Sequence, residues 1–318
     1  MTSKIISADW GSTHVRFRWV DVDTGEMGEE SLGEEGVLTL QKKSGQRGSL
    51  DSLFQEVIYQ HLAAEIQAQA GFPFPLVISG MPSARGAWCE LPYASLPFAL
   101  DGAGAVMRAL PELRWPDQER GMPVLLVSGL AAADDVMRGE ETQVIGLHEM
   151  GLIHEGDTVV LPGTHSKHVR IGQDEVTGFR SFMTGELFHL LGSQSSLATA
   201  LNETPRAGDA AFVHGVEAAK SGDWAASLFP LRARKVLDRA DAAGAASFLS
   251  GLLIGSELRN LALDSTGVMA GSESLLSCYR SAAEVLGLNR YRFVPEGELS
   301  RALVRGQIRL WRRHGKNL

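Results

Sequence analysis

A strand–turn–strand unit that occurs twice is the feature that most constrains the fold of this chain. The first unit spans residues 4–20 and carries Asp9-Trp10-Gly11-Ser12-Thr13 at its turn. The second spans residues 158–171 and carries Pro162-Gly163-Thr164-His165-Ser166. Each turn combines glycine with hydroxyl side chains, and consecutive backbone N–H groups in such a turn form a concavity that binds anions. A unit that recurs at the start and near the middle of the chain indicates two related lobes with facing turns.

The segments between the two units alternate between expected helices and strands. Apolar residues at spacings of three and four predict an amphipathic helix that begins near Leu50. Residues 76–78 and 124–127 are short apolar runs typical of buried strands, and the stretch between them, residues 80–123, is expected to be mostly loop. We expect a helix entry and a helix over residues 134–146. This alternation favours an α/β layered fold.

The part of the chain after the second unit is expected to be mainly helical. Met183-Thr184-Gly185-Glu186-Leu187-Phe188 predicts a helix start with Thr184 as its N-cap. Short strands are expected at residues 267–271 and 291–294, and further helices at residues 207–220, 242–262, 273–286 and 299–313. The chain shows a possible lobe boundary near residues 147–157 and no low-complexity linker.

Composition narrows the classes of partner. The 318 residues carry a formal net charge of −8, which argues against a broad nucleic-acid surface. The two cysteines, Cys89 and Cys278, form neither a disulfide framework nor a metal-ligand cluster. The N-terminal residues lack the apolar stretch of a signal peptide, and no apolar run reaches transmembrane length. We therefore expect a cytoplasmic protein with no nucleic-acid or membrane partner.

Four runs of residues resemble those of a known enzyme family, the 2-dehydro-3-deoxygalactonokinases, which are sugar-acid kinases of the actin/hexokinase/Hsp70-like ATPase superfamily. They occur in the order of the family, and the resemblance covers nearly the whole chain. The runs are Asp9 to Thr13, Asp135-Val136-Met137-Arg138-Gly139-Glu140-Glu141-Thr142-Gln143, Leu161 to Lys167, and Met183 to Phe188.

The resemblance implies an architecture and a reaction. The expected fold is α/β, with two RNase-H-like lobes and ATP in the cleft between them. Residues 1–147 would form the N-terminal lobe, rejoined by a C-terminal helix at 298–318, and residues 148–297 the C-terminal lobe. The implied reaction transfers the γ-phosphate of ATP to the 6-hydroxyl of 2-dehydro-3-deoxy-D-galactonate, giving the 6-phosphate and ADP in galactonate catabolism. The partners implied are thus a small sugar acid and ATP.

The resemblance also implies roles for the two turns. Asp9 would hold Mg²⁺, through water, next to the phosphates. Lys167 either neutralises charge that develops on the transferred phosphate or is a solvated strand lysine. The nucleotide-binding candidates are Gly11, Ser12 and Thr13 in the first phosphate loop, Gly163, Thr164, His165 and Ser166 in the second, and Ala270 and Gly271 in the adenosine-side strand and turn.

The base and the substrate contacts have several candidates. Superfamily sugar kinases place a carboxylate at a helix start before the second phosphate loop, and Asp135, Glu140 and Glu141 all lie in that window. One of them is expected to activate the sugar hydroxyl, and the others to be helix carboxylates. Arg85 is the candidate for the substrate carboxylate, because arginine offers a bidentate fork. Trp88 either stacks on the sugar or packs its loop. Thr184 and Glu186 are further candidates for substrate contacts.

Two other functions compete with this hypothesis. One is a related kinase that acts on another 2-keto-3-deoxy acid or on a sugar. The other is a non-catalytic ATP-binding sugar sensor on the same fold, and the carboxylates at positions 135, 140 and 141 argue against it. A hydrolytic ATPase of the chaperone kind would need a substrate-binding domain for which the chain has no room.

Overall fold

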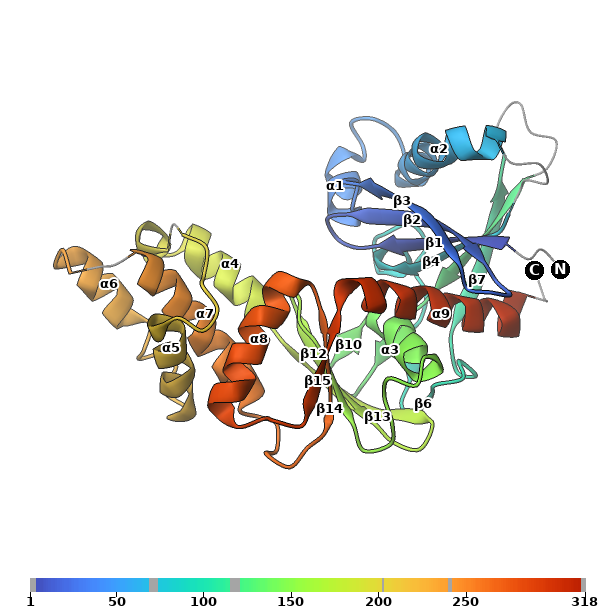
Figure 1. The fold of residues 1–318 in the computed structure, drawn as a ribbon. Coiled ribbons are helices and arrows are strands. Elements are labelled where there is room, and N and C mark those ends of the chain that lie inside the picture. The colour runs from blue at the N-terminus through green and yellow to red at the C-terminus, as the bar shows by residue number, and fades with distance from the viewer. Residues whose placement is uncertain (1–3, 69–73, 115–120, 202, 240–241, 316–318) are drawn as a thin grey trace. The chain divides into compact units, whose positions relative to one another are not determined.

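The computed structural model describes residues 4–68, 74–114, 121–201, 203–239 and 242–315. The chain divides into two compact units (Figure 1). Unit 1 comprises Met1–Leu152, Asp174–Thr177 and Ser300–Leu318, and unit 2 comprises Ile153–Gln173 and Gly178–Leu299.

A six-stranded sheet with the order β3-β2-β1-β4-β8-β7 forms the centre of unit 1. The first hairpin pairs β1 with β2 in antiparallel register from Lys4↔Asp21 to Trp10↔Val15, and β1, β4 and β8 run parallel. The strands are β1 (Lys4–Trp10), β2 (Val15–Asp21), β3 (Met27–Gly33), β4 (Leu76–Gly80), β7 (Met107–Leu113) and β8 (Met122–Val127). A third strand beside the hairpin and two parallel strands on its other side give the strand order of an RNase-H-like core.

Helices cover both faces of this sheet. On one face, Trp10 packs edge-on against Phe17 of β2 and Phe54 of α2, inside a buried apolar cluster. On the other face, the Gln307 amide of α9 donates to the Ala8 carbonyl. The helices of unit 1 are α1 (Val37–Lys43), α2 (Leu50–Ala68), α3 (Glu140–Glu149) and most of α9 (Glu296–His314), with a 3-10 turn at Met81–Ser83.

Short strands complete unit 1. β5 (Ala94–Ser95), β9 (Leu130–Ala131) and β10 (Val136–Met137) form a small separate sheet. β6 (Phe98–Ala99) pairs with the first residues of β13, as Val176↔Phe98 and Glu175↔Ala99.

Unit 2 repeats the strand order of unit 1. Its strands lie in the order β15-β14-β11-β12-β13, with β11 and β12 antiparallel and β11, β14 and β15 parallel. The bounds are β11 (Thr158–Leu161), β12 (Ser166–Ile171), β13 (Glu175–Phe182), β14 (Gly267–Gly271) and β15 (Tyr291–Pro295). In each unit the recurring hairpin is flanked by a third strand on one side and by two parallel strands on the other. The prediction of two RNase-H-like α/β lobes is confirmed.

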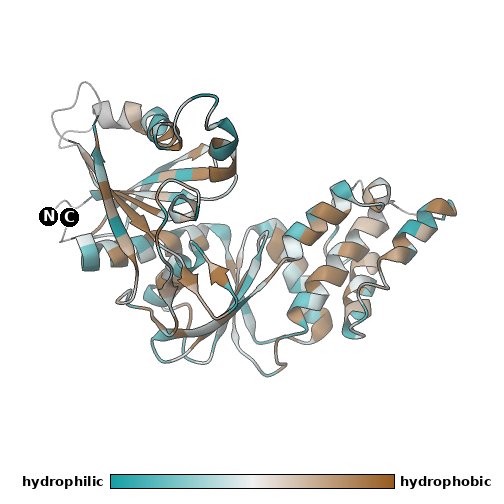
Figure 2. Ribbon diagram, turned by 180° about the vertical axis from the view of Figure 1, so that it is seen from behind, coloured by the Kyte–Doolittle hydropathy of each residue, from teal (hydrophilic) through white to brown (hydrophobic). Residues whose placement is uncertain are grey.

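The helices of unit 2 bury a largely apolar interior. Val160 and Met269 of the sheet pack with Phe212, Ile254 and Tyr279 of three different helices. Figure 2 shows apolar segments in the strands and along these helices. The helices are α4 (Thr184–Gln194), α5 (Ala210–Lys220), α6 (Phe229–Val236), α7 (Ala242–Leu258) and α8 (Glu273–Leu286), with a 3-10 turn at Ala198–Ala200.

The secondary structure differs from the prediction in two places. The helix expected over residues 134–146 begins only at Glu140, because Val136–Met137 pairs with Leu130–Ala131 and Gly139 adopts a φ of 105° that ends the preceding strand. The stretch 80–123, expected to be mostly loop, contains β7, which pairs antiparallel with β8. Among the described helices, none has the length and apolar character needed to cross a membrane.

Candidate functional site

In the first turn, residues 11–14, three carbonyl groups accept hydrogen bonds from the start of α1 and the residue before it, while two backbone N–H groups have no acceptor in the described chain. The carbonyls of Gly11, Ser12 and Thr13 accept from the N–H groups of Val37, Leu38 and Gly36 respectively, at 3.0–3.1 Å. Within the described chain, the N–H groups of Ser12 and Thr13 donate to no acceptor. This is the arrangement of an anion-binding turn.

A glycine makes this contact possible. A Cβ on Gly36 would lie 2.3 Å from Thr13 backbone atoms, so a larger residue would push α1 off the turn. Trp10, the last residue of β1, is fully buried and donates from Nε1 to the Glu35 carbonyl at 2.8 Å. This bond ties the end of β1 to the segment that precedes α1. The turn is therefore held on two sides by segments distant in sequence.

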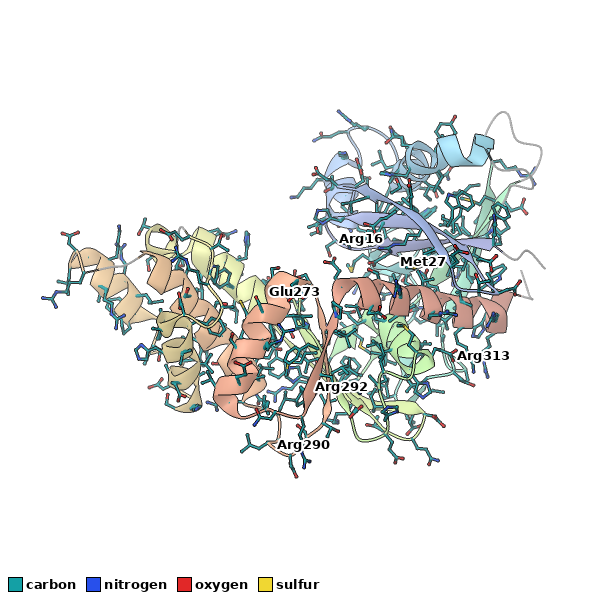
Figure 3. The ribbon with its side chains drawn as sticks, viewed as in Figure 1. Arg16, Met27, Glu273, Arg290, Arg292 and Arg313 are labelled. Carbon is teal, nitrogen blue, oxygen red and sulfur yellow. The ribbon has the colours of Figure 1, made fainter. Side chains whose placement is uncertain are left out.

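Asp9 lies at the end of β1 among charged neighbours. Its carboxylate is 3.7 Å from the Arg16 guanidinium on β2, which Figure 3 labels, and 28% of its side chain is exposed. Burial raises the pKa of Asp9, and Arg16 and then Arg18 oppose this, while the charge of nearby Glu140 raises it further. The Asp9 and Glu140 carboxylates therefore lie within electrostatic range of one another.

Glu141 is the buried member of the carboxylate group. It is 3% exposed, and its oxygens accept from the Gly139 N–H at 2.7 Å and the Thr142 hydroxyl at 3.0 Å. Burial, and after it the charge of Glu140, raises the pKa of Glu141 to about 7. Both glutamates begin α3, where the helix dipole favours negative charge.

The third carboxylate, Asp135, lies outside the helix start. It precedes β10 and accepts from the N–H of Val136 at 2.8 Å. Glu140, in contrast, is half-buried at the first position of α3 and accepts from the Arg138 N–H at 2.8 Å. The structure thus separates the three base candidates by their surroundings.

The loop that carries Arg85 and Trp88 packs against α2. The Trp88 ring stacks on Phe54 with centroids 4.9 Å apart, and its Nε1 donates to Asp51 at 2.7 Å. Trp88 therefore holds its loop against α2, and stacking on the sugar stays a prediction. Arg85 is exposed.

The second turn is built like the first. The N–H of Glu186 donates to the Thr164 carbonyl at 3.0 Å, so that the start of α4 lies on the turn as α1 lies on the first. A Cβ on Gly185 would be 2.4 Å from the Gly163 carbonyl oxygen, which again requires glycine. The Glu186 carboxylate pairs with His165 Nε2 at 2.5 Å. Glu186 thus holds the turn through both its backbone and its side chain.

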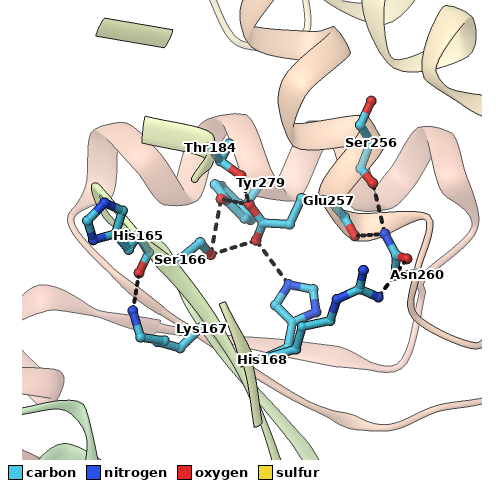
Figure 4. Close-up of polar contacts among 10 residues, drawn as sticks. His165, Ser166, Lys167, His168, Thr184, Ser256, Glu257, Asn260 and Tyr279 are labelled. Atoms are coloured by element: carbon cyan, nitrogen blue, oxygen red, sulfur yellow. Dashed lines mark hydrogen bonds and ion pairs between the residues drawn. The ribbon is translucent and has the colours of Figure 1, made fainter. Parts of the chain in front are cut away.

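A buried glutamate that the sequence analysis did not single out organises the interior below this turn (Figure 4). Glu257 of α7 is 2% exposed and accepts from Ser166 Oγ at 2.6 Å, His168 Nε2 at 2.9 Å and the Tyr279 hydroxyl at 2.8 Å, as well as from the Thr184 hydroxyl. Burial, and next the Glu257 charge, raises the pKa of Tyr279 well above its ordinary value. In the sequence, Glu257 stands out only as an acidic residue within the apolar run of α7.

Three predictions for this region need correction. The Ser166 side chain is fully buried and its hydroxyl donates to Glu257, so that the hydroxyl points away from any phosphate at the turn. Lys167 is 4% exposed and donates from Nζ to the His165 carbonyl at 2.8 Å, so it is not a solvated lysine. Thr184 is the first residue of α4, not its N-cap, and its hydroxyl donates to Glu257.

A pocket of about 240 Å³ lies beside the second turn within unit 2. Its wall is mainly apolar and includes Gly163 of the turn, Leu253 of α7 and Leu275 of α8. Ala270 and Gly271 end the buried strand β14 shortly before α8. A Cβ added to Gly271 would lie 3.7 Å from Cδ of Pro162. The predicted adenosine-side strand and the second turn are therefore neighbours.

Comparisons with known proteins place the chain among sugar-acid kinases. The profile of the 2-keto-3-deoxy-galactonokinase family matches residues 9–306. The chain is 36% identical over 311 residues to "Probable 2-dehydro-3-deoxygalactonokinase DgoK1" of Rhizobium meliloti (strain 1021), covering 93% of this chain and 94% of that protein. It is 29% identical over 296 residues to the 2-dehydro-3-deoxygalactonokinase of Escherichia coli (strain K12), covering 90% and 91%.

A solved structure agrees with these sequence matches. A crystal structure from Sinorhizobium meliloti, assigned to the 2-dehydro-3-deoxygalactonokinases, superposes with a TM-score of 0.81 at 34% identity. The match covers 96% of each chain.

Proposed function

This chain belongs to the 2-keto-3-deoxy-galactonokinase family, and we propose that it transfers the γ-phosphate of ATP to the 6-hydroxyl of 2-dehydro-3-deoxy-D-galactonate. The observation that carries the proposal is the family match over residues 9–306, which includes both phosphate turns and the carboxylates that begin α3. The products are 2-dehydro-3-deoxy-6-phosphogalactonate and ADP.

The nucleotide is held mainly by unit 2. The apolar pocket beside Gly163 accepts the adenine, because its wall offers aliphatic side chains and its position next to the turn puts the phosphates within reach. Thr164 and the backbone N–H groups of the second turn bind phosphate oxygens. Lys167 adds a positive charge fixed below the turn through the His165 carbonyl. Glu186, Thr184 and Glu257 hold this turn in shape.

Mg²⁺ fits the surroundings of Asp9. The Asp9 side chain is 28% exposed. Burial and the charge of nearby Glu140 raise the pKa of Asp9, and a bound cation would stabilise its charged form against both effects. In the described part of the chain no cluster of three or more acidic, histidine or cysteine side chains forms a metal cage. Mg²⁺ usually takes one or two carboxylates, and water and substrate phosphates complete its coordination. The ion would neutralise negative charge on the phosphates during transfer.

Glu140 acts as the general base. It lies at the start of α3, beside Asp9, whereas Glu141 is buried and Asp135 precedes β10. The Glu140 carboxylate takes the proton of the 6-hydroxyl as that oxygen bonds to the γ-phosphorus. The bond between the γ-phosphorus and the bridging oxygen breaks, and ADP leaves. Ser12 and Thr13 donate backbone N–H bonds to the transferred phosphate.

A coupled ADP-release assay across 2-keto-3-deoxy acids and aldoses tests this proposal. We expect kcat/KM for 2-dehydro-3-deoxy-D-galactonate to exceed that for every other acceptor. Glu140→Gln is expected to lower kcat by about 10²–10⁴-fold with little change in KM, because the proton acceptor is lost. The exposed Asp134 gives a matched control, Asp134→Asn, which should retain wild-type kcat.

Two outcomes would contradict the assignment. Turnover that falls in Asp135→Asn but survives in Glu140→Gln would move the base to Asp135. ATP binding without turnover of any acceptor would favour a sugar sensor over a kinase.

A further inference from the structure

Arg138 is a fixed arginine next to the proposed base. Its guanidinium lies 4.2 Å from the centroid of the Tyr93 ring, and Nη1 donates to the Ser83 hydroxyl at 2.6 Å. Ser83 is itself fixed, because its hydroxyl donates to the Val127 carbonyl at 2.7 Å. The guanidinium is thus oriented by a ring face and by a buried hydroxyl before any ligand arrives.

The guanidinium of Arg138 forms no ion pair among the described residues. Its two side-chain contacts are to neutral groups. Its Nε is buried and has no acceptor in the described chain. A partly buried guanidinium without an anion is unfavourable, so the site gains free energy when an anion binds.

The position of Arg138 in the chain indicates which anion its guanidinium binds. Its own backbone N–H donates to the carboxylate of Glu140 at 2.8 Å, so the arginine and the proposed base belong to one short segment. Among the described residues, Nη2 and the second hydrogen of Nη1 have no acceptor, and together they offer the fork that matches a carboxylate. A sugar acid carries a carboxylate at one end and its reactive hydroxyl at the other.

We propose that Arg138 binds the carboxylate of the sugar-acid acceptor, a proposal that rests on the kinase function proposed above. Arg85, the candidate from the sequence, is exposed and makes no hydrogen bond or ion pair within the described chain. Its long side chain would lose conformational freedom on binding, whereas Arg138 is already ordered. Selection of acids over neutral sugars is then a property of the Ser83–Tyr93–Arg138 group.

Binding and kinetics of the full chain with Arg138→Gln, Arg138→Lys and Arg85→Gln test the proposal. The acceptor is 2-dehydro-3-deoxy-D-galactonate, and the probe is its C1 primary amide, which keeps the size of the acid and removes its charge. Arg138→Gln is expected to raise the acid KM about 10–100-fold and to leave the ATP KM within about twofold. Wild type should bind the acid much more tightly than the amide in calorimetry, and Arg138→Gln should bind both alike.

Controls separate this role from a structural one. The exposed Arg108 provides a matched change, Arg108→Gln, which should alter neither KM. If Arg138→Gln does not fold, Arg138→Lys keeps the charge without the planar fork, and a several-fold rise in the acid KM alone supports the proposal.

The possible results are distinguishable. Arg138 variants with wild-type acid KM, together with a raised KM in Arg85→Gln, would overturn the proposal and leave the kinase function intact. Wild-type protein that binds the acid through Arg138 but never phosphorylates it would refute the kinase function and uphold the binding site.

Discussion

Replacement of Glu257 by glutamine tests the buried network below the second turn. The side chain of Glu257 is 1% exposed, and its two oxygens accept hydrogen bonds from Ser166, His168, Tyr279 and Thr184. A carboxylate only accepts, so all four partners donate to it. Glutamine keeps the shape but replaces one oxygen by an NH₂ group, which would face donors.

The magnitude follows from the bonds that are lost. Ser166 and His168 donate to Oε1, and Tyr279 and Thr184 donate to Oε2. Either amide orientation therefore removes two charge-assisted bonds, which the hydroxyl groups replace only by turning to accept weaker neutral bonds from the NH₂ group. A hydrogen bond to a charged group contributes about 1.5–3 kcal/mol, which gives a loss of about 3–6 kcal/mol. Release of a buried charge offsets part of this, so that we expect a net loss of about 2–4 kcal/mol.

Thermal unfolding and ATP titration measure the effect. At about 2–4 °C per kcal/mol, the Tm falls by roughly 4–16 °C. The ATP Kd is also expected to rise, because Ser166 and Thr184 no longer fix the turn. Glu217→Gln, which removes an exposed pair with Lys220, is the control and should change stability by less than about 1 kcal/mol. A Glu257→Gln protein with the Tm and the ATP Kd of wild type would show that the Glu257 network neither stabilises the fold nor shapes the turn.

Three further changes test other parts of the structure. Folded Glu141 (pKa about 7) keeps a proton that an unfolded glutamate releases near pH 4.5, so the contribution of Glu141 to stability is lost as pH rises from about 4.5 to 7. In urea unfolding, the free energy of unfolding of Glu141→Gln should therefore fall by about 3 kcal/mol less than that of wild type over this range. The same pH dependence in both proteins would contradict the raised pKa. Gly146→Ala would put a Cβ 1.6 Å from the Ala302 carbonyl oxygen and should cost at least about 3 kcal/mol in urea unfolding, whereas Gly297→Ala, in open space, should stabilise by up to about 1 kcal/mol; similar values for the two would argue against this packing. Leu275→Trp should fill the pocket beside the second turn and raise the ATP Kd at least about tenfold in calorimetry, and an unchanged Kd would place the adenine elsewhere.

The two hairpins could be predicted from sequence because their signal is local. Glycine and hydroxyl residues between alternating strands define each turn, and the structure has β1–β2 and β11–β12 around them. The contacts that complete the turns are not local. Gly36 and Gly185 lie against turns that precede them by more than twenty residues, and only the path of the folded chain shows why glycine is required.

The acidic residues show what spacing in the sequence can predict and what it cannot. Asp135, Glu140 and Glu141 could be listed from spacing, but the strand pairing of Val136–Met137 decides that the helix starts at Glu140. A two-residue strand has too few positions to show a period. Glu257 escaped notice because its partners lie up to 91 residues away, and an isolated acid in an apolar helix carries no spacing that points to them.

Product analysis of the wild-type reaction shows whether the protein phosphorylates the 6-hydroxyl of the sugar acid. Purified protein would be incubated with ATP, Mg²⁺ and 2-dehydro-3-deoxy-D-galactonate, and the product examined by phosphorus–proton correlation NMR. We expect one equivalent of ADP and a single phosphate ester, coupled to the C6 protons of the sugar acid. Phosphate on another carbon, or inorganic phosphate released without any ester, would contradict it.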